Sequence, residues 1–115
     1  MKELKSLIIS AFRSRGRLAI KEFKSYEFDK LAVTRNPIEI SAVIRKSDKE
    51  YVVYFCEKPL EYACTCKDQS TRKTFCKHLI ALLLKCYELG ELTEEDLKRI
   101  LNYFTKQRVT LEVFM

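Results

Sequence analysis

Four side chains of the kinds that bind transition metals lie close together in the middle of this 115-residue chain. Cys64 and Cys66 form a Cys-x-Cys pair, and after nine intervening residues Cys76 and His78 form a Cys-x-His pair. Thiolates and imidazoles are ligands that Zn²⁺ prefers, and four of them complete a closed tetrahedral site. We therefore predict that Cys64, Cys66, Cys76 and His78 bind one structural Zn²⁺ ion.

Disulfide bonds and ordinary core packing are the two alternatives for these cysteines. The chain has five cysteines, an odd number, and a bond between Cys64 and Cys66 would close a strained small ring. Core packing would place the one histidine of the chain in a Cys-x-His pair by coincidence. Zinc is therefore the favoured interpretation. Cys56 and Cys86 lie in apolar segments outside the pattern and are predicted to be small core residues.

The length of the apolar runs indicates whether the protein crosses a membrane or is secreted. The longest runs, 51–56 and 79–84, have six residues each, whereas a membrane-spanning helix needs about 20. The first residues contain too short an apolar run for a signal peptide. We expect an intracellular protein without a membrane partner, in the cytoplasm or, in a eukaryote, the nucleus. Clustered cysteines in such a reducing compartment more often bind metal than form disulfides.

The spacing of the apolar residues predicts the elements that hold the first ligand pair. A three- and four-residue spacing predicts a helix over 2–14 that ends near Gly16, and a weaker signal indicates a short helix over 17–26. Alternation over 31–55 then indicates half-buried strands. A last extended stretch that starts at Pro59 runs into the Cys-x-Cys pair. These strands predict an antiparallel sheet of three or four strands.

A helical period returns after the second ligand pair. Residues 79–87 are apolar on most sides, which predicts a helix packed in the core and ended by Gly90. Thr93 and Asp96 have the spacing of an N-terminal cap for a further helix. The tail over 109–115 alternates weakly and is either a final strand or a partner-binding segment. We predict one α+β domain over 1–115, with a small antiparallel sheet, an N-terminal helix and two C-terminal helices.

These elements would aim the four ligands at one point. Residues i and i+2 of a strand face the same side, so Cys64 and Cys66 can direct both sulfurs together. Cys76 and His78 lie where a turn enters a helix, and the positive end of the helix dipole favours a thiolate there. The segment between the pairs, 67–75, is polar and has almost no core of its own. Metal binding would supply the free energy that closes it.

The spacing Cys-x-Cys and Cys-x-His resembles the SWIM zinc finger. The strand predicted over 51–55 precedes the first pair, and Cys76-Lys77-His78-Leu79-Ile80-Ala81 begins the helix, as in SWIM domains. Ala81 matches an alanine found in the SWIM subgroup that partners RecA-family recombinases in homologous recombination. The resemblance covers about 17–88, followed by a C-terminal helix and tail at 91–115. It implies an interaction module that acts in DNA recombination or repair.

The same residues argue against an enzyme. A closed Cys₃His site has no open coordination position for a substrate or a reactive water. The chain has no second histidine to serve as a base, and its two glycines are isolated, so no phosphate-binding loop is present. We predict a non-enzymatic binding protein. A role as a zinc sensor or store ranks lower, because four ligands indicate permanent occupancy.

The net charge of +6 points to nucleic acid as one candidate partner. Residues 1–35 contain nine Lys and Arg against four acids, while the rest of the chain is nearly balanced, with thirteen against twelve. Basic side chains bind phosphates without reading sequence. The candidate contacts are Arg13, Arg15, Arg17, Lys21, Lys67, Arg72 and Lys73. A solvated basic face without a ligand is the alternative.

A protein partner is the second candidate. The acidic turn at 91–96, the last helix and the apolar tail would then form a docking surface for a RecA-family recombinase or another protein. The same tail could also join two copies of the chain, or it could simply add a strand to the sheet. This adaptor would have no direct contact with nucleic acid.

Overall fold

The structure is a computed structural model that describes residues 2–72 and 74–114, with side chains at 3–72 and 74–105. Four strands in the described part form one sheet: β1 (Glu27–Thr34), β2 (Glu39–Lys46), β3 (Lys49–Cys56) and β4 (Glu61–Cys64). The helices are α1 (Lys2–Phe12), α2 (Ser14–Glu22), the 3₁₀ turn η1 (Phe23–Ser25), α3 (Lys67–Arg72), α4 (Lys77–Glu88) and α5 (Glu94–Phe114). The predicted α+β class is confirmed.

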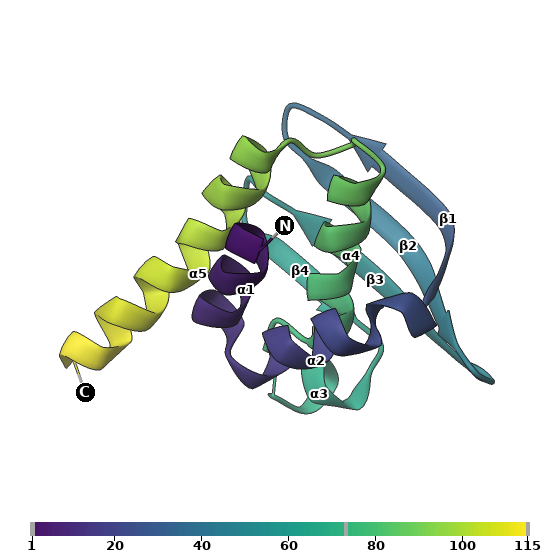
Figure 1. The fold of residues 1–115 in the computed structure, drawn as a ribbon, viewed down its shortest axis with the longest axis horizontal. Helices are drawn as coiled ribbons and strands as arrows, with labels where there is room; N and C mark the ends of the chain where they lie inside the picture. Colours follow the sequence, from purple (N-terminus) through teal and green to yellow (C-terminus); the bar gives the residue numbers. More distant parts are fainter. Residues whose placement is uncertain (1, 73, 115) are drawn as a thin grey trace.

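The sheet is a meander in which each strand pairs antiparallel with the next, in the order β1-β2-β3-β4 (Figure 1). Its inner face is apolar because alternate residues of β2 point inward: Ile40, Ala42 and Ile44 are buried, and their neighbours are more exposed. The register sets Ile44 opposite Tyr51 and Val53 opposite Cys64. Through this register the apolar inner face extends from β2 to the end of β4, where the first ligand pair begins.

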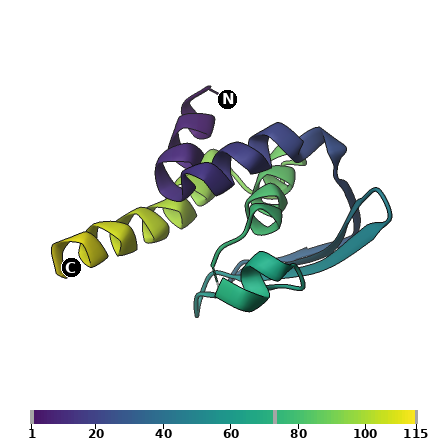
Figure 2. The same ribbon diagram turned by 90° about the horizontal axis from the view of Figure 1, so that it is seen from below.

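One helix fills the core between the sheet and the N-terminal helices. Eight of the twelve residues of α4 are buried, which confirms that a helix apolar on most sides packs in the interior. Figure 2 shows α4 on one face of the sheet, with α2 on the side of α4 that faces away from the sheet. Helix α1 packs against α5 (Figure 1). The two ends of the chain therefore contribute to one core.

An aromatic cluster joins these elements just before the second ligand pair. Phe75 stacks on Phe12 of α1 with ring centroids 5.1 Å apart, and it lies 4.5 Å from Phe104 of α5. Tyr62 of β4 meets Phe75 edge-on at 5.0 Å. Buried aromatic contacts contribute more than their area alone. This cluster fixes the position of the residue next to Cys76.

The N-terminal region differs from the prediction of one helix over 2–14. The first helix ends at Phe12 because Arg13 has φ 54°, a conformation that a helix interior does not allow. The chain then continues as α2, which begins three residues before the predicted short helix and is followed by η1. Gly16, expected to end a helix, lies inside α2. A single change of direction at Arg13 therefore produces two helices.

Gly16→Ala is expected to destabilise the protein by about 1–3 kcal/mol through overpacking. A Cβ atom at this position would lie 2.8 Å from the carbonyl oxygen of Ile8 and 3.1 Å from its Cγ2, so α1 and α2 would have to separate. Denaturant titration at saturating zinc measures the free energy of unfolding. Arg17→Ala, on an exposed position of the same helix, is the control and should change it by less than about 0.5 kcal/mol. Equal effects of the two substitutions would contradict the role of the glycine.

The predicted boundaries between the two C-terminal helices are confirmed. Gly90 follows α4 with φ +80°, a conformation that favours glycine at a helix end. Thr93 and Asp96 form a reciprocal cap: the Asp96 amide donates to Thr93 Oγ1 and the Thr93 amide to Asp96 Oδ2, both at 3.0 Å. Helix α5 continues to Phe114, so the first of the two alternatives for the tail, a final strand, is wrong for the described residues. The tail side chains lie outside the described residues.

An ion network anchors the start of α5 to the sheet. Asp96, which is 6% exposed, accepts hydrogen bonds from Arg35 of the β1–β2 turn at 2.9 Å and from Arg99 at 3.1 Å. Arg99 also donates to both carboxylate oxygens of the buried Glu57, at 2.6 and 3.1 Å. Two buried acids thus share two arginines. Burying a carboxylate is costly unless it is paired in this way.

Candidate metal centre and the adjoining pocket

The four predicted ligands come from three positions in the fold. Cys64 is the last residue of β4 and Cys66 lies two residues beyond it, so the expectation that both belong to one strand is wrong. The Gln69 amide donates to Cys66 Sγ at 3.5 Å, and the first turn of α3 holds this sulfur in place. Cys76 caps α4 and His78 lies in its first turn, as predicted. The turn after β4, and not a longer strand, therefore directs the Cys66 sulfur to the same side as the Cys64 sulfur.

The ligand atoms meet in one buried cluster. The three sulfurs and the imidazole nitrogen lie within 4.8 Å of one another, and all four residues are buried. His78 Nδ1 is 3.8 Å from Cys64 Sγ and 3.9 Å from Cys76 Sγ. A tetrahedron with Zn–S of ~2.3 Å and Zn–N of ~2.0–2.1 Å separates its ligand atoms by roughly 3.6–3.8 Å. The residues present therefore fit a zinc ion, after a small contraction.

The electrostatics of the cluster favour a thiolate at Cys76. A hydrogen bond from the Cys64 thiol lowers the pKa of Cys76 against the opposing effect of burial, and hydrogen bonds from His78 and the Leu79 amide add to the lowering. The same bond, together with burial, raises the pKa of Cys64. Zn²⁺ binds thiolates, so it would displace the remaining thiol protons. Three thiolates and one dication leave the centre with a charge of −1.

Two tyrosines fix the imidazole ring. Tyr51 of β3 stacks on His78 with ring centroids 4.0 Å apart, and Tyr26 meets it edge-on at 5.6 Å. The Tyr26 hydroxyl is buried and has no hydrogen-bond partner among the described residues, and burial raises its pKa. Rings packed on two sides of the imidazole restrict its rotation. Nδ1 is therefore held toward the sulfurs.

Ion pairs tie α2 to both halves of the centre. Arg15 binds Asp68 of α3 through Nε at 2.7 Å and Nη2 at 3.0 Å. Glu22, at the other end of α2, accepts from Lys77, next to the ligand His78, at 2.9 Å. Glu22 also pairs with Lys46 of β2. The basic N-terminal segment thus folds against the centre, a point that the sequence left open.

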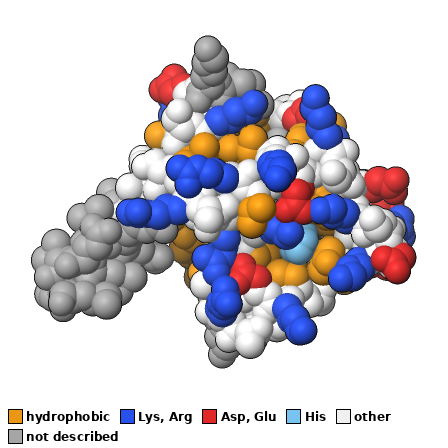
Figure 3. Space-filling model, turned by 60° about the horizontal axis from the view of Figure 1, so that its bottom comes forward, with side chains coloured by type: hydrophobic (Ala, Val, Ile, Leu, Met, Phe, Trp, Pro, Cys, Tyr) orange, Lys and Arg blue, Asp and Glu red, His pale blue; other side chains and the backbone are white. Residues whose placement is uncertain are grey.

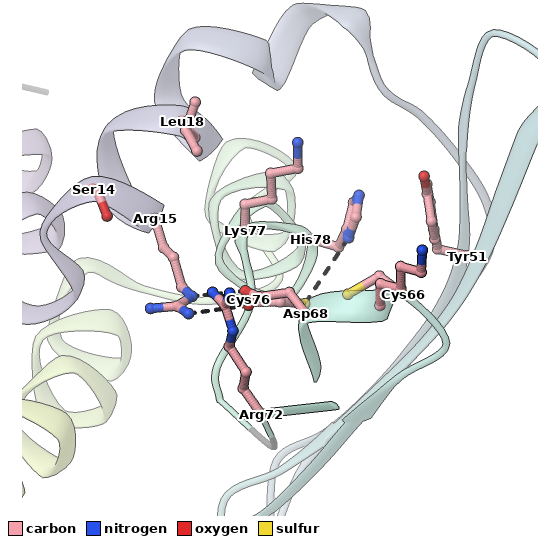
Figure 4. A pocket seen from close by; sticks show the side chains of 11 residues that line it. Ser14, Arg15, Leu18, Tyr51, Cys66, Asp68, Arg72, Cys76, Lys77 and His78 are labelled. Carbon is pink, nitrogen blue, oxygen red and sulfur yellow. Dashed lines mark hydrogen bonds and ion pairs between the residues drawn. The ribbon is translucent and has the colours of Figure 1, made fainter. Parts of the chain in front are cut away.

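A pocket of about 500 Å³ opens beside the cluster, between α2 and α3 (Figure 4). Cys66, Cys76 and His78 form part of its floor. Leu18 and Tyr51 supply apolar surface on opposite sides of the view in Figure 4. Four cations also line it: Arg15, Lys67, Arg72 and Lys77. The basic residues of α3 therefore lie beside those of α2.

The predicted nucleic-acid contacts fall into three places. Arg15, Lys67 and Arg72 line the pocket beside the centre, where the structure also places Lys77. Arg13 and Arg17 line a separate hollow at the α1–α2 corner. Lys21 lies at a third hollow with Lys5 and Lys24. Lys73 lies outside the described residues.

Other residues near the centre had no signal in the sequence. Glu22, Lys46 and Tyr51 are separated from the residues they contact by 24 or more positions along the chain, so no local spacing could identify them. Cys56 and Cys86 lie outside the metal cluster, and both are buried. Burial raises the pKa of Cys86 to about 12, as expected of a core thiol.

Three thiols and one imidazole at the junction of a β-hairpin and a helix define a small zinc-finger domain. Residues 48–87 match the SWIM zinc finger family model. This segment is therefore similar to a SWIM zinc finger, and its Cys/Cys/Cys/His group is positioned for Zn²⁺. The match begins just before β3 and ends within α4, a shorter region than the 17–88 predicted. No curated protein matches the chain, and neither does any solved structure.

Within the described residues, no helix combines the length and the apolar character needed to cross a bilayer.

Proposed function

We propose that this protein is a non-enzymatic module that holds one structural Zn²⁺ through Cys64, Cys66, Cys76 and His78 and binds the phosphate backbone of nucleic acid. The observation that carries the proposal is the basic surface around the centre. Figure 3 shows Lys and Arg side chains in blue on several sides of the pale-blue histidine. We place the protein inside the cell, in the cytoplasm or the nucleus.

The acids on this surface do not cancel its positive charge. Asp68 is shared by Arg15 and Arg72, and Glu22 is shared by Lys46 and Lys77, so each acid faces two cations. Within the described part of the chain, four more cations make no ion pair: Lys67 in the pocket, and Arg17, Lys21 and Lys24 in the two other hollows. The zinc centre itself carries −1 and does not attract phosphate. Lys and Arg side chains therefore supply the attraction.

We further propose a role in DNA recombination or repair, which rests on the resemblance to the SWIM subgroup that partners RecA-family recombinases. Ala81, the residue that carries this resemblance, is completely buried in α4. Core packing alone would also explain a small residue at this position, whether or not the chain belongs to the subgroup. A test of this role therefore has to measure binding to a protein partner as well as binding to nucleic acid.

Arg17→Ala/Lys21→Ala is expected to weaken binding to a single-stranded oligonucleotide and to flatten its salt dependence. Each phosphate contact adds about 0.7 to the negative slope of log K against log salt for single strands. Loss of two contacts should reduce that slope by roughly 1.4. Fluorescence anisotropy of a labelled oligothymidine between low and physiological salt measures both quantities.

The matched control is Lys30→Ala/Lys58→Ala, which removes the same charge from exposed positions in β1 and in the β3–β4 turn. This control should leave the salt slope nearly unchanged. Equal loss in both double variants would mean that only net charge matters. No binding by the wild type at low salt would overturn the nucleic-acid proposal.

A protein adaptor without nucleic-acid contact is the alternative function. Its predicted docking surface includes the tail, whose side chains lie outside the described residues. A pull-down from the native host, with Cys76→Ser as the unfolded control, would test it. Recovery of a recombinase without nucleic acid would favour the adaptor, and the mass of the purified protein would show whether copies associate.

A further inference from the structure

We propose that an apolar pocket at the end of α2 receives one unstacked base of a single-stranded nucleic acid, with Phe23 as the ring on which the base packs. This inference rests on the proposed function, because it takes the ligand to be nucleic acid. It adds the form of nucleic acid that the protein prefers, and a contact that does not depend on charge.

The pocket has a volume of about 420 Å³ and lies where the end of α2 and the turn η1 meet α4. Its apolar lining consists of Ile20, Phe23 and Leu84. Leu84 belongs to the core helix α4 and is only 6% exposed, so the floor of the pocket reaches the core. A concave site of this size, with an apolar lining and a few charged groups, is typical of sites that bind small organic groups. The pocket therefore suits one planar ring system.

Phe23 is the aromatic residue of this lining. Its side chain is half-buried and packs against the core. Phe28 of β1 supports it, with ring centroids 5.9 Å apart and an interplanar angle of 46°. The ring of Phe23 is thus held in place and still contributes surface to the pocket. Nucleic-acid bases stack on protein aromatic rings of this kind with little dependence on sequence.

Positive charge surrounds this apolar surface. Lys5 of α1, Lys21 of α2 and Lys24 of η1 line the same pocket, and all three are exposed. The one acid of the lining, Glu88, is bound to Lys85 at 2.9 Å. The three lysines give +3 and the Glu88–Lys85 pair adds nothing, so the pocket keeps +3. Its charge and its apolar floor together complement a ligand in which a planar apolar group is attached to negative charges.

The cations continue beyond the pocket, which favours a chain of negative charges over a single small anion. Arg17, Lys21 and Lys24 are spaced by four and three residues, so they follow one side of α2 into η1. Arg17 lines the next hollow, at the α1–α2 corner, together with Arg13. In nucleic acid, phosphates repeat along the strand and each carries a base. A duplex keeps its bases stacked inside, so only a single strand can place a base in the pocket while its phosphates follow these cations.

Phe23→Leu tests the inference, because it keeps an apolar side chain and removes the aromatic ring. The probes are a labelled oligothymidine and an abasic strand of the same length, and anisotropy measures their binding to the zinc-loaded full chain. The wild type should bind oligothymidine about tenfold more tightly than the abasic strand. Phe23→Leu should lose about that factor for oligothymidine only, and its salt slope should stay unchanged because no cation is lost. The matched control is Phe28→Leu, which removes the neighbouring ring outside the pocket lining and should keep the wild-type affinity.

The outcomes separate this inference from the proposed function. Equal wild-type affinity for the two strands, or equal effects of Phe23→Leu and Phe28→Leu, would overturn the base contact, while salt-dependent binding of both strands would leave the proposed function intact. No binding of either strand at low salt would refute the proposed function and this inference with it. If Phe23→Leu does not fold, the wild-type comparison of the two strands decides the question. An oligoglutamate of equal charge that competes as well as oligothymidine would show that any acidic chain is accepted, and it would overturn the inference.

Discussion

Chelation of zinc is expected to abolish the cooperative unfolding transition of this protein. The binding energy of a structural zinc, roughly 10–16 kcal/mol, is as large as the whole stability of a typical domain, about 5–15 kcal/mol. Helix α3, which separates the two ligand pairs, has no buried residues of its own. Without the metal, three buried thiols and a histidine would face one another, and the partly exposed ion pair between Arg15 and Asp68 would be left to hold α3. Circular dichroism during thermal unfolding, before and after a chelator and again with added Zn²⁺, measures the effect.

Two cysteines of the same region provide a matched comparison. Cys76 and Cys86 are both completely buried, at the start and near the end of α4. Cys76→Ser should lose zinc and the cooperative transition. Cys86→Ser should keep one zinc per chain and lose only about 1–3 kcal/mol for a buried hydroxyl. A chelated protein that unfolds at the same temperature as the zinc-loaded one would show that the metal is not structural.

Asp96→Asn is expected to destabilise the protein by about 2–3 kcal/mol at neutral pH. The substitution keeps an oxygen for the cap at Thr93 but removes the charge that faces Arg35 and Arg99. Arg99 would then retain only Glu57 as an ionic partner. Denaturant titration at saturating zinc measures the loss. Asp48→Asn, an exposed position in the β2–β3 turn, should have almost no effect.

The effect of Asp96 should depend on pH in a defined direction. Burial raises the pKa of Asp96, but hydrogen bonds from Arg35, Thr93 and Arg99 outweigh it and hold the pKa below its usual value. The unfolded chain therefore binds this proton more readily than the folded one. The stability from Asp96 is complete above the unfolded pKa, near 3.9, and is lost as the pH falls through the lower folded pKa. The difference between wild type and Asp96→Asn should accordingly be constant from pH 7 to about 5 and shrink below that. A constant difference at pH 4 and below would contradict this assignment.

The metal cluster could be predicted because its information is local. Each ligand pair has a spacing of two, and the helix after His78 has a clear apolar pattern. The position of Cys66 could not be predicted, because β4 ends at Cys64 and the turn into α3 brings the sulfur back. Helix α3 itself has no apolar stripe, so only its end charges, Asp68 and Arg72, indicate a helix.

The surroundings of the cluster could not be predicted, because they depend on contacts between distant segments. Arg15 and Asp68 are 53 residues apart, and Glu22 and Lys77 are 55 apart. No periodicity links such pairs. The sequence identified Arg15 as basic, but only the fold shows that it lies beside the zinc-binding residues. The single helix expected over 2–14 failed for a related reason, because the close approach of Gly16 to Ile8 is tertiary.

The packing of α1 against α5 has a consequence for the order of events during protein synthesis. Glu3 of α1 pairs with Lys98 of α5 at 3.4 Å, and Phe12 meets Phe104 with ring centroids 5.0 Å apart. Glu3 thus obtains its partner from a residue 95 positions further along the chain. The meander and the zinc ligands need only neighbouring segments and can assemble while translation continues. Helix α1 reaches its full packing only after α5 has been synthesised.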